Sequence, residues 1–122
     1  MESILTSIKK LLGIEEDYTH FDSDIVMHIN SVFMILTQLG LGPDEGFVIE
    51  DDSTNWDEFV KDPIKLQAVK SYMYLKVRLL FDPPSNSTHM DAINRSISEL
   101  EWRLKVDAEM MRSKAEEELQ NG

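Results

Sequence analysis

The chain has 122 residues, enough for one domain with a modest core, and it contains no cysteine. Acidic residues outnumber basic ones 23 to 12, which gives a net charge of −11. A surface of this sign repels phosphate, which argues against tight binding to nucleic acid or anionic lipid. The absence of cysteine excludes disulfides, thiol nucleophiles and thiolate metal sites, and it fits a reducing compartment. No apolar run is long enough to cross a bilayer and residues 1–10 lack the pattern of a signal peptide, so we expect a soluble intracellular protein.

The first half of the chain predicts two helices. Apolar residues at helical spacing indicate one over about residues 3–12, ended by Gly13. A second helix is predicted over about 23–39, with Asp22 or Ser23 as its cap. No residue from 25 to 40 is acidic or basic apart from histidine, so this helix must be covered on nearly every side.

The second half predicts two longer helices. The third has Asp62 as its cap and Pro63 at its first position, and it extends to about residue 81. The fourth begins near Ser87, and its apolar residues recur at intervals of three and four from Met90 to Leu104, as in a heptad seam. These elements predict an all-α fold, a small bundle of about four helices with a long C-terminal helix.

A long acidic connection, residues 40–62, separates the second and third predicted helices. It holds eight acidic residues against one base, Lys61. Residues 47–49 could form a short strand, and residues 54–60 a helical turn with Trp56 and Phe59 facing inward. Structureless loops of this length are usually functional or disordered. Within it we single out Glu50, Asp51 and Asp52 as acids that face a partner, with a solvated loop as the alternative.

No pattern in the sequence points to catalysis, a cofactor or a metal. The histidines at 20, 28 and 89 form no metal-binding pair, and a helix cap explains the carboxylates at 22 and 24 better than a metal site. There is no glycine-rich phosphate loop and no nucleophile motif. The helices also lack the paired carboxylates that all-α nucleotide pyrophosphatases need for magnesium. We therefore predict a protein that is not an enzyme.

The second and third predicted helices carry more apolar surface than one partner in a four-helix chain can cover. The excess either fills the core or meets another subunit, and we favour a subunit interface. The residues assigned to that interface are Ile25, Ile29, Met34, Tyr72, Leu75 and Leu79.

The fourth predicted helix extends beyond the core on which it can pack. After Leu104 the apolar stripe shifts to Ala108, Met111, Ala115 and Leu119, with Glu116–Glu118 outside it. We divide the chain into a helical domain, residues 1–106, and an acidic extension, residues 107–122, that is either helical or a frayed tail. Methionine and tryptophan are adaptable or strongly anchoring contact residues. Trp102, Met110, Met111 and Leu119 are therefore singled out as residues that contact another protein.

Several sequence segments, in the order in which they occur along the chain, resemble those of one protein family. LTSIKKLLGI precedes the acidic EEDYTHFDSDI, then come HINSVFMILTQLG, WDEF and KSYMYLKVRLLFDPP, which ends at Pro84, and finally SELEWRL. Over residues 2–106 the chain is similar to the head–tail connector, or adaptor, family of long-tailed bacteriophages. The most specific part is Lys70 to Pro84, where aromatic, basic and aliphatic residues alternate before the Asp-Pro-Pro stop.

The resemblance implies a structural protein of the virion neck that is made in the host cytoplasm. Protomers of the family form a ring, expected to be dodecameric, under the portal protein. The ring extends the DNA channel, which DNA traverses without specific binding, and it presents a platform for the next tail-completion or stopper protein. The last helix of the family reaches toward the portal, which implies portal binding by Trp102, Met110, Met111 and Leu119, and no membrane is involved. The resemblance also implies that Glu50, Asp51 and Asp52 face the DNA channel or the next tail protein.

A different class of function is an acidic DNA mimic that inhibits a DNA-binding enzyme. A mimic needs carboxylates spaced like phosphates along one exposed face. Here the acids concentrate in one connection and the termini, while the third predicted helix has four bases and no acid. This distribution favours the connector over the mimic.

Overall fold

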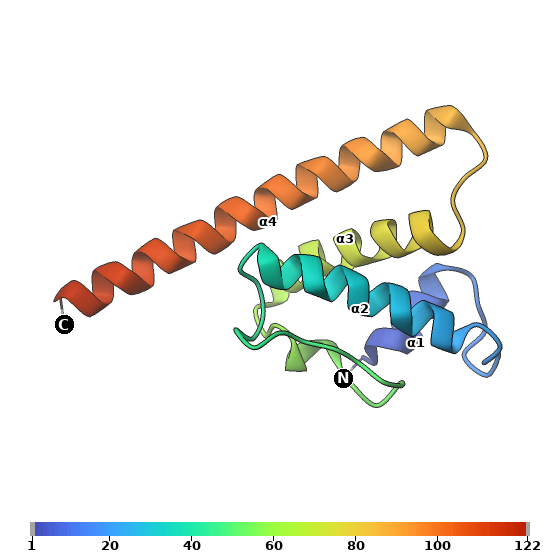
Figure 1. Cartoon of the computed structure of the whole chain (residues 1–122), viewed down its shortest axis with the longest axis horizontal. Coiled ribbons are helices and arrows are strands. Elements are labelled where there is room, and N and C mark those ends of the chain that lie inside the picture. Colours follow the sequence, from blue (N-terminus) through green and yellow to red (C-terminus); the bar gives the residue numbers. More distant parts are fainter. Residues whose placement is uncertain (1, 122) are drawn as a thin grey trace.

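The computed structural model describes residues 2–121 and is all-helical, which confirms the predicted fold class. Its elements are α1 (Ile4–Leu11), α2 (Asp22–Gln38), the short 3-10 turn η1 (Trp56–Glu58), α3 (Pro63–Phe81) and α4 (Ser87–Asn121). Helices α1, α2 and α3 form the body of the protein, and α4 lies along α3 and continues well beyond the body (Figure 1). No helix within residues 2–121 has the length and apolar character needed to span a membrane.

Local signals account for most helix ends. Gly13 follows α1 with a positive φ of 81°, the left-handed conformation that glycine adopts without strain. Asp62 caps α3, because its Oδ1 accepts from the backbone N–H groups of Ile64 and Lys65 at 2.9 and 3.3 Å. The predicted cap of α2 is wrong, since Phe21 holds the N-cap position and no side chain caps this helix.

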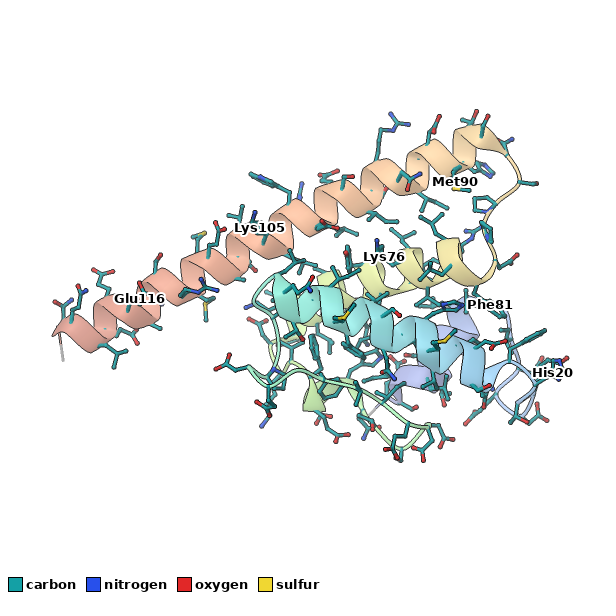
Figure 2. The ribbon with its side chains drawn as sticks, in the orientation of Figure 1. His20, Lys76, Phe81, Met90, Lys105 and Glu116 are labelled. Atoms are coloured by element: carbon teal, nitrogen blue, oxygen red, sulfur yellow. The ribbon has the colours of Figure 1, made fainter. Side chains whose placement is uncertain are left out.

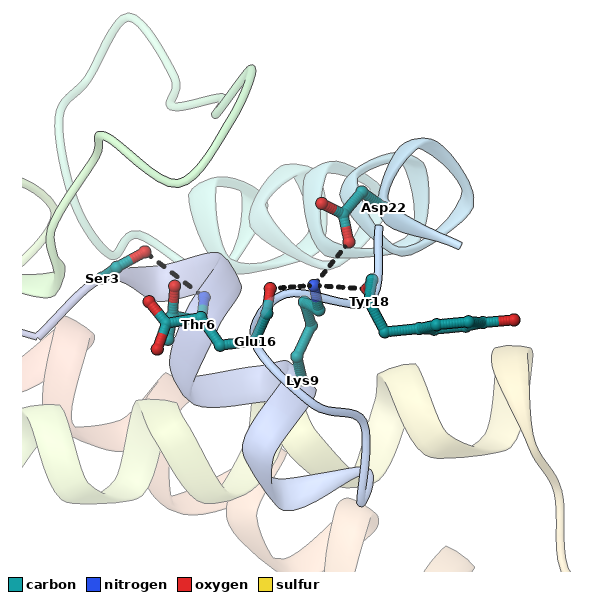
Figure 3. A network of polar contacts seen from close by, with 6 residues as sticks. All are labelled: Ser3, Thr6, Lys9, Glu16, Tyr18 and Asp22. Carbon is teal, nitrogen blue, oxygen red and sulfur yellow. Dashed lines mark hydrogen bonds and ion pairs between the residues drawn. The ribbon is translucent and has the colours of Figure 1, made fainter. Parts of the chain in front are cut away.

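Asp22 is instead paired with a buried lysine of α1 (Figure 3). The Lys9 Nζ lies 2.8 Å from Asp22 Oδ1 and donates to the backbone oxygens of Glu16 at 3.0 Å and Tyr18 at 2.8 Å. Its side chain is only 3% exposed. A buried ammonium is tolerated only when it is paired and hydrogen-bonded, as it is here. The contact fastens the segment between α1 and α2 to the body.

The core joins the three body helices and draws on the connection and α4. Its buried side chains include Ile25, Ile29 and Tyr72, which are fully inaccessible. These three predicted interface residues therefore offer no surface to a second subunit, and that part of the interface prediction is wrong. Leu75 and Leu79 are half-buried and pack against the same core. The sequence argument failed because the connection between α2 and α3 covers apolar surface that four helices alone would leave open.

That connection is held by specific contacts rather than by regular structure. Asn30 on α2 accepts from the backbone N–H of Ile49 at 2.8 Å and donates to its carbonyl at 2.9 Å. An isolated bridge joins Ser3 to Asn55. Residues 47–49 form no strand, contrary to the prediction, because Asn30 takes the place of a strand neighbour. The predicted turn is confirmed, with Trp56 and Phe59 both buried.

Trp56 acts as the anchor of the connection. Its ring is buried, and its Nε1 donates to the hydroxyl of Ser7 at 2.7 Å. Ser7 in turn donates to the carbonyl of Ile4 on the same helix. A buried tryptophan needs a partner for its N–H, and α1 supplies it. The far end of the connection is thereby fixed to α1.

Helix α4 is continuous from Ser87 to Asn121, so no break separates residues 1–106 from the extension. Ile97 and Leu104 of the predicted seam are buried, and Ala108 is the last core residue. The hydroxyl of Tyr72 donates to Glu101 Oε2 at 2.9 Å and ties α3 to α4. Beyond Ala108 every described residue is exposed, and Figure 2 shows Glu116 on the part of α4 outside the body. We call residues 109–121 the arm.

Candidate interaction surfaces

A groove between α2 and the connection exposes large apolar side chains. It has a volume of about 530 Å³ and is lined by Asn30, Met34, Thr37, Gln38, Glu45, Gly46, Phe47 and Val48. Met34 is 59% exposed and Val48 is 68% exposed. Met34 is the predicted interface residue that the structure leaves open to a partner. We call this feature the Met34 groove.

The packing of core residues behind the groove determines the shape of its wall. The ring of Phe33 packs against Phe47 and Phe59, with ring centroids 4.9 and 4.7 Å apart. Gly42 lies where a Cβ would overlap the Phe59 ring, and its φ of 77° is left-handed. Asn30 then holds the backbone at Ile49. Val48, which lies between Phe47 and Ile49 in the chain, points outward as a result. Sequence reasoning missed Asn30, because no local pattern shows that an amide on α2 pairs with a residue 19 positions away.

The three predicted channel or tail-facing acids are all on the surface. Glu50, Asp51 and Asp52 are exposed and lie next to each other in the connection. The Asp51 carboxylate accepts from the hydroxyl and the backbone N–H of Ser53, which lowers the pKa of Asp51. These hydrogen bonds favour the charged form of Asp51.

The four predicted portal-binding residues lie on two different sides of α4. Successive residues of a helix are about 100° apart, so Met111, Ala115 and Leu119 continue the side on which Leu104 and Ala108 face the body. We call these three residues the arm stripe; Leu119 is 82% exposed.

Trp102, Val106 and Met110 form a second stripe on the side of α4 that faces away from the body. Trp102 is 66% exposed and Met110 is 65% exposed. We call these three residues the outer stripe. The sequence analysis placed residues of both stripes in one binding set, although they cannot contact the same flat surface.

Some of the basic side chains of α3 interact with other residues of the same chain. Lys70 pairs with Glu2 at 2.9 Å and lies over the ring of Trp56, 5.9 Å from its centroid. Arg78 donates to the hydroxyl of Tyr74 at 3.4 Å. Lys70 thus neutralises an acid at the N-terminus rather than one in the acidic connection.

No arrangement for chemistry emerges among residues 2–121. No group of three or more potential metal-ligating side chains comes together in this part of the chain. Burial and the hydrogen bond to Glu101 raise the pKa of Tyr72, which keeps its hydroxyl protonated and unreactive. The features that stand out are surfaces for contact: a groove, two apolar stripes and an acidic cluster.

The comparison with known families decides what kind of protein this is. The model of the phage connector protein family matches residues 4–111, which is most of the chain. The chain belongs to the phage connector family. The resemblance noted in the sequence is therefore confirmed, and the family is one of structural proteins of the phage neck. Neither a curated protein nor a solved structure matches the chain.

The family match covers most of these surfaces but not the end of the arm. The matched segment includes the Met34 groove, the acidic cluster and the outer stripe, and it ends at Met111. The rest of the arm lies beyond the match. What the arm contacts must therefore be argued from its own residues.

Proposed function

We propose that this connector forms a dodecameric ring under the portal protein, extends the DNA channel and joins the capsid to the tail. Membership of the phage connector family supports this function. The observation that carries it is the set of large apolar side chains that the protomer leaves uncovered on several faces, including Met34, Val48, Trp102 and Leu119. Soluble monomers rarely expose such patches, whereas subunits of an assembly cover them with each other. Family membership favours this function over a DNA mimic.

The ring interface is proposed to include the Met34 groove. Met34→Glu would place a charge in an apolar contact and should give a folded, smaller species, because burying an unpaired charge costs several kcal/mol. Met27 offers a matched control: it is also on α2 and also 59% exposed, but it does not line the groove. Light scattering on both variants measures the effect. A wild-type protein that stays monomeric both alone and on portal-bearing capsids would contradict the ring.

The portal is proposed to receive the arm stripe. An amphipathic helix that lays one side into a groove is a common recognition mode, and no side chain of the arm is buried against the described part of the chain. A truncation must spare Ala108, which is buried, and Arg112, which lies over Gly40. Truncation after Arg112 should therefore leave the body folded and reduce co-sedimentation with portal-bearing capsids. Unchanged co-sedimentation would remove this role from the arm.

The acidic cluster is proposed to face the DNA channel or the next tail protein. A negatively charged channel wall repels the phosphate backbone and lets DNA move without adhering. Replacing Glu50, Asp51 and Asp52 by Gln or Asn should preserve folding, since exposed charges have few packed partners. It should slow DNA passage or weaken assembly with the stopper protein. Normal infectivity with all three acids neutralised would contradict this role.

A further inference from the structure

The outer stripe of α4 is a strong anchor without a partner in its own chain. Trp102 is 66% exposed although it lies in the middle of a helix whose other side is packed. Tryptophan is enriched among the few residues that dominate the energy of protein interfaces. Half-buried Val106 and exposed Met110 extend the stripe by two turns, so the apolar surface is a band rather than a single side chain.

The charges around this band are unusual for so acidic a protein. Three bases, Arg95, Arg103 and Lys105, are exposed near Trp102. Of the two acids in the same stretch, Glu99 is outward and pairs with Arg103 at 2.7 Å, while Glu101 is turned toward Tyr72. The outer side of α4 is therefore basic around Trp102, although exposed Asp107 and Glu109 lie farther along the helix, beside Val106 and Met110.

The Met34 groove has the opposite character. Met34, Phe47 and Val48 are the apolar part of its lining, and Glu45 is the charged residue that lines it. The connection, which forms one side of the groove, carries eight acids and one base. The Trp102 end of the outer stripe and the Met34 groove are thus complementary in charge, and an exposed tryptophan of the stripe matches a partly apolar groove.

The two surfaces cannot meet within one protomer. In Figure 1 α4 lies on one side of the body, and the connection between α2 and α3 begins beside α4 at Gly40 and then runs along the other side. Trp102 faces away from the body, because Ile97 and Leu104 on the opposite side of the helix are buried. Two complementary surfaces on opposite sides of one chain join copies head to tail, and such contacts close into a ring when the rotation permits.

We infer that Trp102 and the outer stripe of one copy occupy the Met34 groove of the next copy. This inference rests on the proposed ring and names the two surfaces that build it. It assigns Trp102 and Met110 to contact between copies, and it leaves Met111 and Leu119 of the arm stripe for the portal.

A complementation experiment with the full chain tests the head-to-tail pairing. Trp102→Glu retains an intact groove, and Met34→Glu retains an intact outer stripe. Each variant alone should associate more weakly than the wild type by about thirtyfold or more, the effect of losing an interface hot spot. Mixed in equal amounts, they should form a heterodimer that cannot grow, because only one productive contact remains. Mass photometry counts the subunits, and circular dichroism confirms that each variant is folded.

Directed crosslinking tests the same contact at defined positions, because the native chain has no cysteine. Ser98 lies one turn before Trp102 on the exposed side of α4, and Glu45 lines the groove. The double variant Ser98→Cys/Glu45→Cys should give a ladder of covalent oligomers with a short bismaleimide. The control Ser98→Cys/Glu15→Cys, in which the second cysteine is exposed between α1 and α2, should not.

The outcomes separate this inference from the proposed function. Rings that persist in Trp102→Glu, with no crosslink between positions 98 and 45, would overturn the inference and leave the ring function intact. Protection of the groove only after a tail protein is added would overturn it by naming another occupant. A wild-type protein that never assembles, alone or on portal-bearing capsids, would refute the proposed ring and the inference with it.

Discussion

Asn30 is the side chain on which the shape of the Met34 groove depends, and Asn30→Ala tests this directly. The substitution removes both hydrogen bonds to Ile49, of 2.8 and 2.9 Å, whose side chain is buried. A buried backbone group left without a partner costs about 1–3 kcal/mol. Asn30 itself is only half-buried, so water can replace part of each bond. We therefore expect the N–H and the carbonyl of Ile49 each to cost an amount near the low end of this range. Together they should lower the free energy of unfolding by about 2–3 kcal/mol.

Urea denaturation followed by the fluorescence of buried Trp56 measures this loss, and hydrogen exchange locates it. The backbone amide of Ile49 should be protected in the wild type and exchange rapidly in Asn30→Ala. Ser31→Ala is the matched control, because Ser31 is exposed and bonds only to Met27 of its own helix. It should change stability by less than about 0.5 kcal/mol. An Ile49 amide that stays protected in Asn30→Ala, with stability unchanged, would refute the role given to Asn30.

Three other substitutions test contacts that hold the helices and the connection in place. Burial and its bond to Glu101 raise the pKa of Tyr72, so stability should fall as pH rises above about 10, the unfolded value. Tyr72→Phe should remove that fall in urea titrations from about pH 8 to 11 and cost about 1 kcal/mol at neutral pH. Lys9→Ala should lower the free energy of unfolding by about 2–3 kcal/mol, which is less than the loss of a fully buried ion pair because Asp22 is 28% exposed. The control Lys10→Ala, at an exposed position, should change stability little. Gly42→Ala should lower the melting temperature more than Gly46→Ala, because only Gly42 combines a left-handed φ with an overlap against Phe59.

The sequence predicted what depends on neighbouring residues. Asp62 and Pro63 together define the start of α3, and Gly13 ends α1, because capping and left-handed φ are properties of a few adjacent residues. Trp56 and Phe59 were predicted to face inward for a similar reason, since a single turn places both on one side.

Prediction failed where the partner is distant in the sequence. Asp22 has the position of a helix cap, but the buried ammonium of Lys9 attracts its carboxylate. Residues 47–49 have the composition of a strand, but the groups that bind them belong to Asn30 rather than to another strand. Neither competing contact leaves a local pattern, so the sequence could not have indicated it.

The number of apolar faces on the helices does not determine which residues form a subunit interface. The uncharged α2 does need cover on nearly every side, as the sequence indicated, but periodicity cannot say which element supplies the cover. The irregular connection packs on α2 at Asn30 and Phe33. Ile25 and Ile29 are buried in the core, whereas Met34 stays open to a partner. Half-buried Leu75 would report on folding if a charge were placed there, which makes Met34 the better probe of assembly.

The two stripes of α4 extend this reasoning from the protomer to the neck. Met110 and Met111 are adjacent in the sequence and therefore about 100° apart on the helix, so one partner on one side cannot cover both. The body covers α4 on one side only, and only as far as Ala108. We therefore propose that α4 contacts a neighbouring copy through Trp102 and a different protein through Leu119. Trp102→Glu and Leu119→Glu should consequently have separable effects, the first on subunit number and the second on capsid binding. Loss of both properties in either variant would mean that α4 serves a single interface.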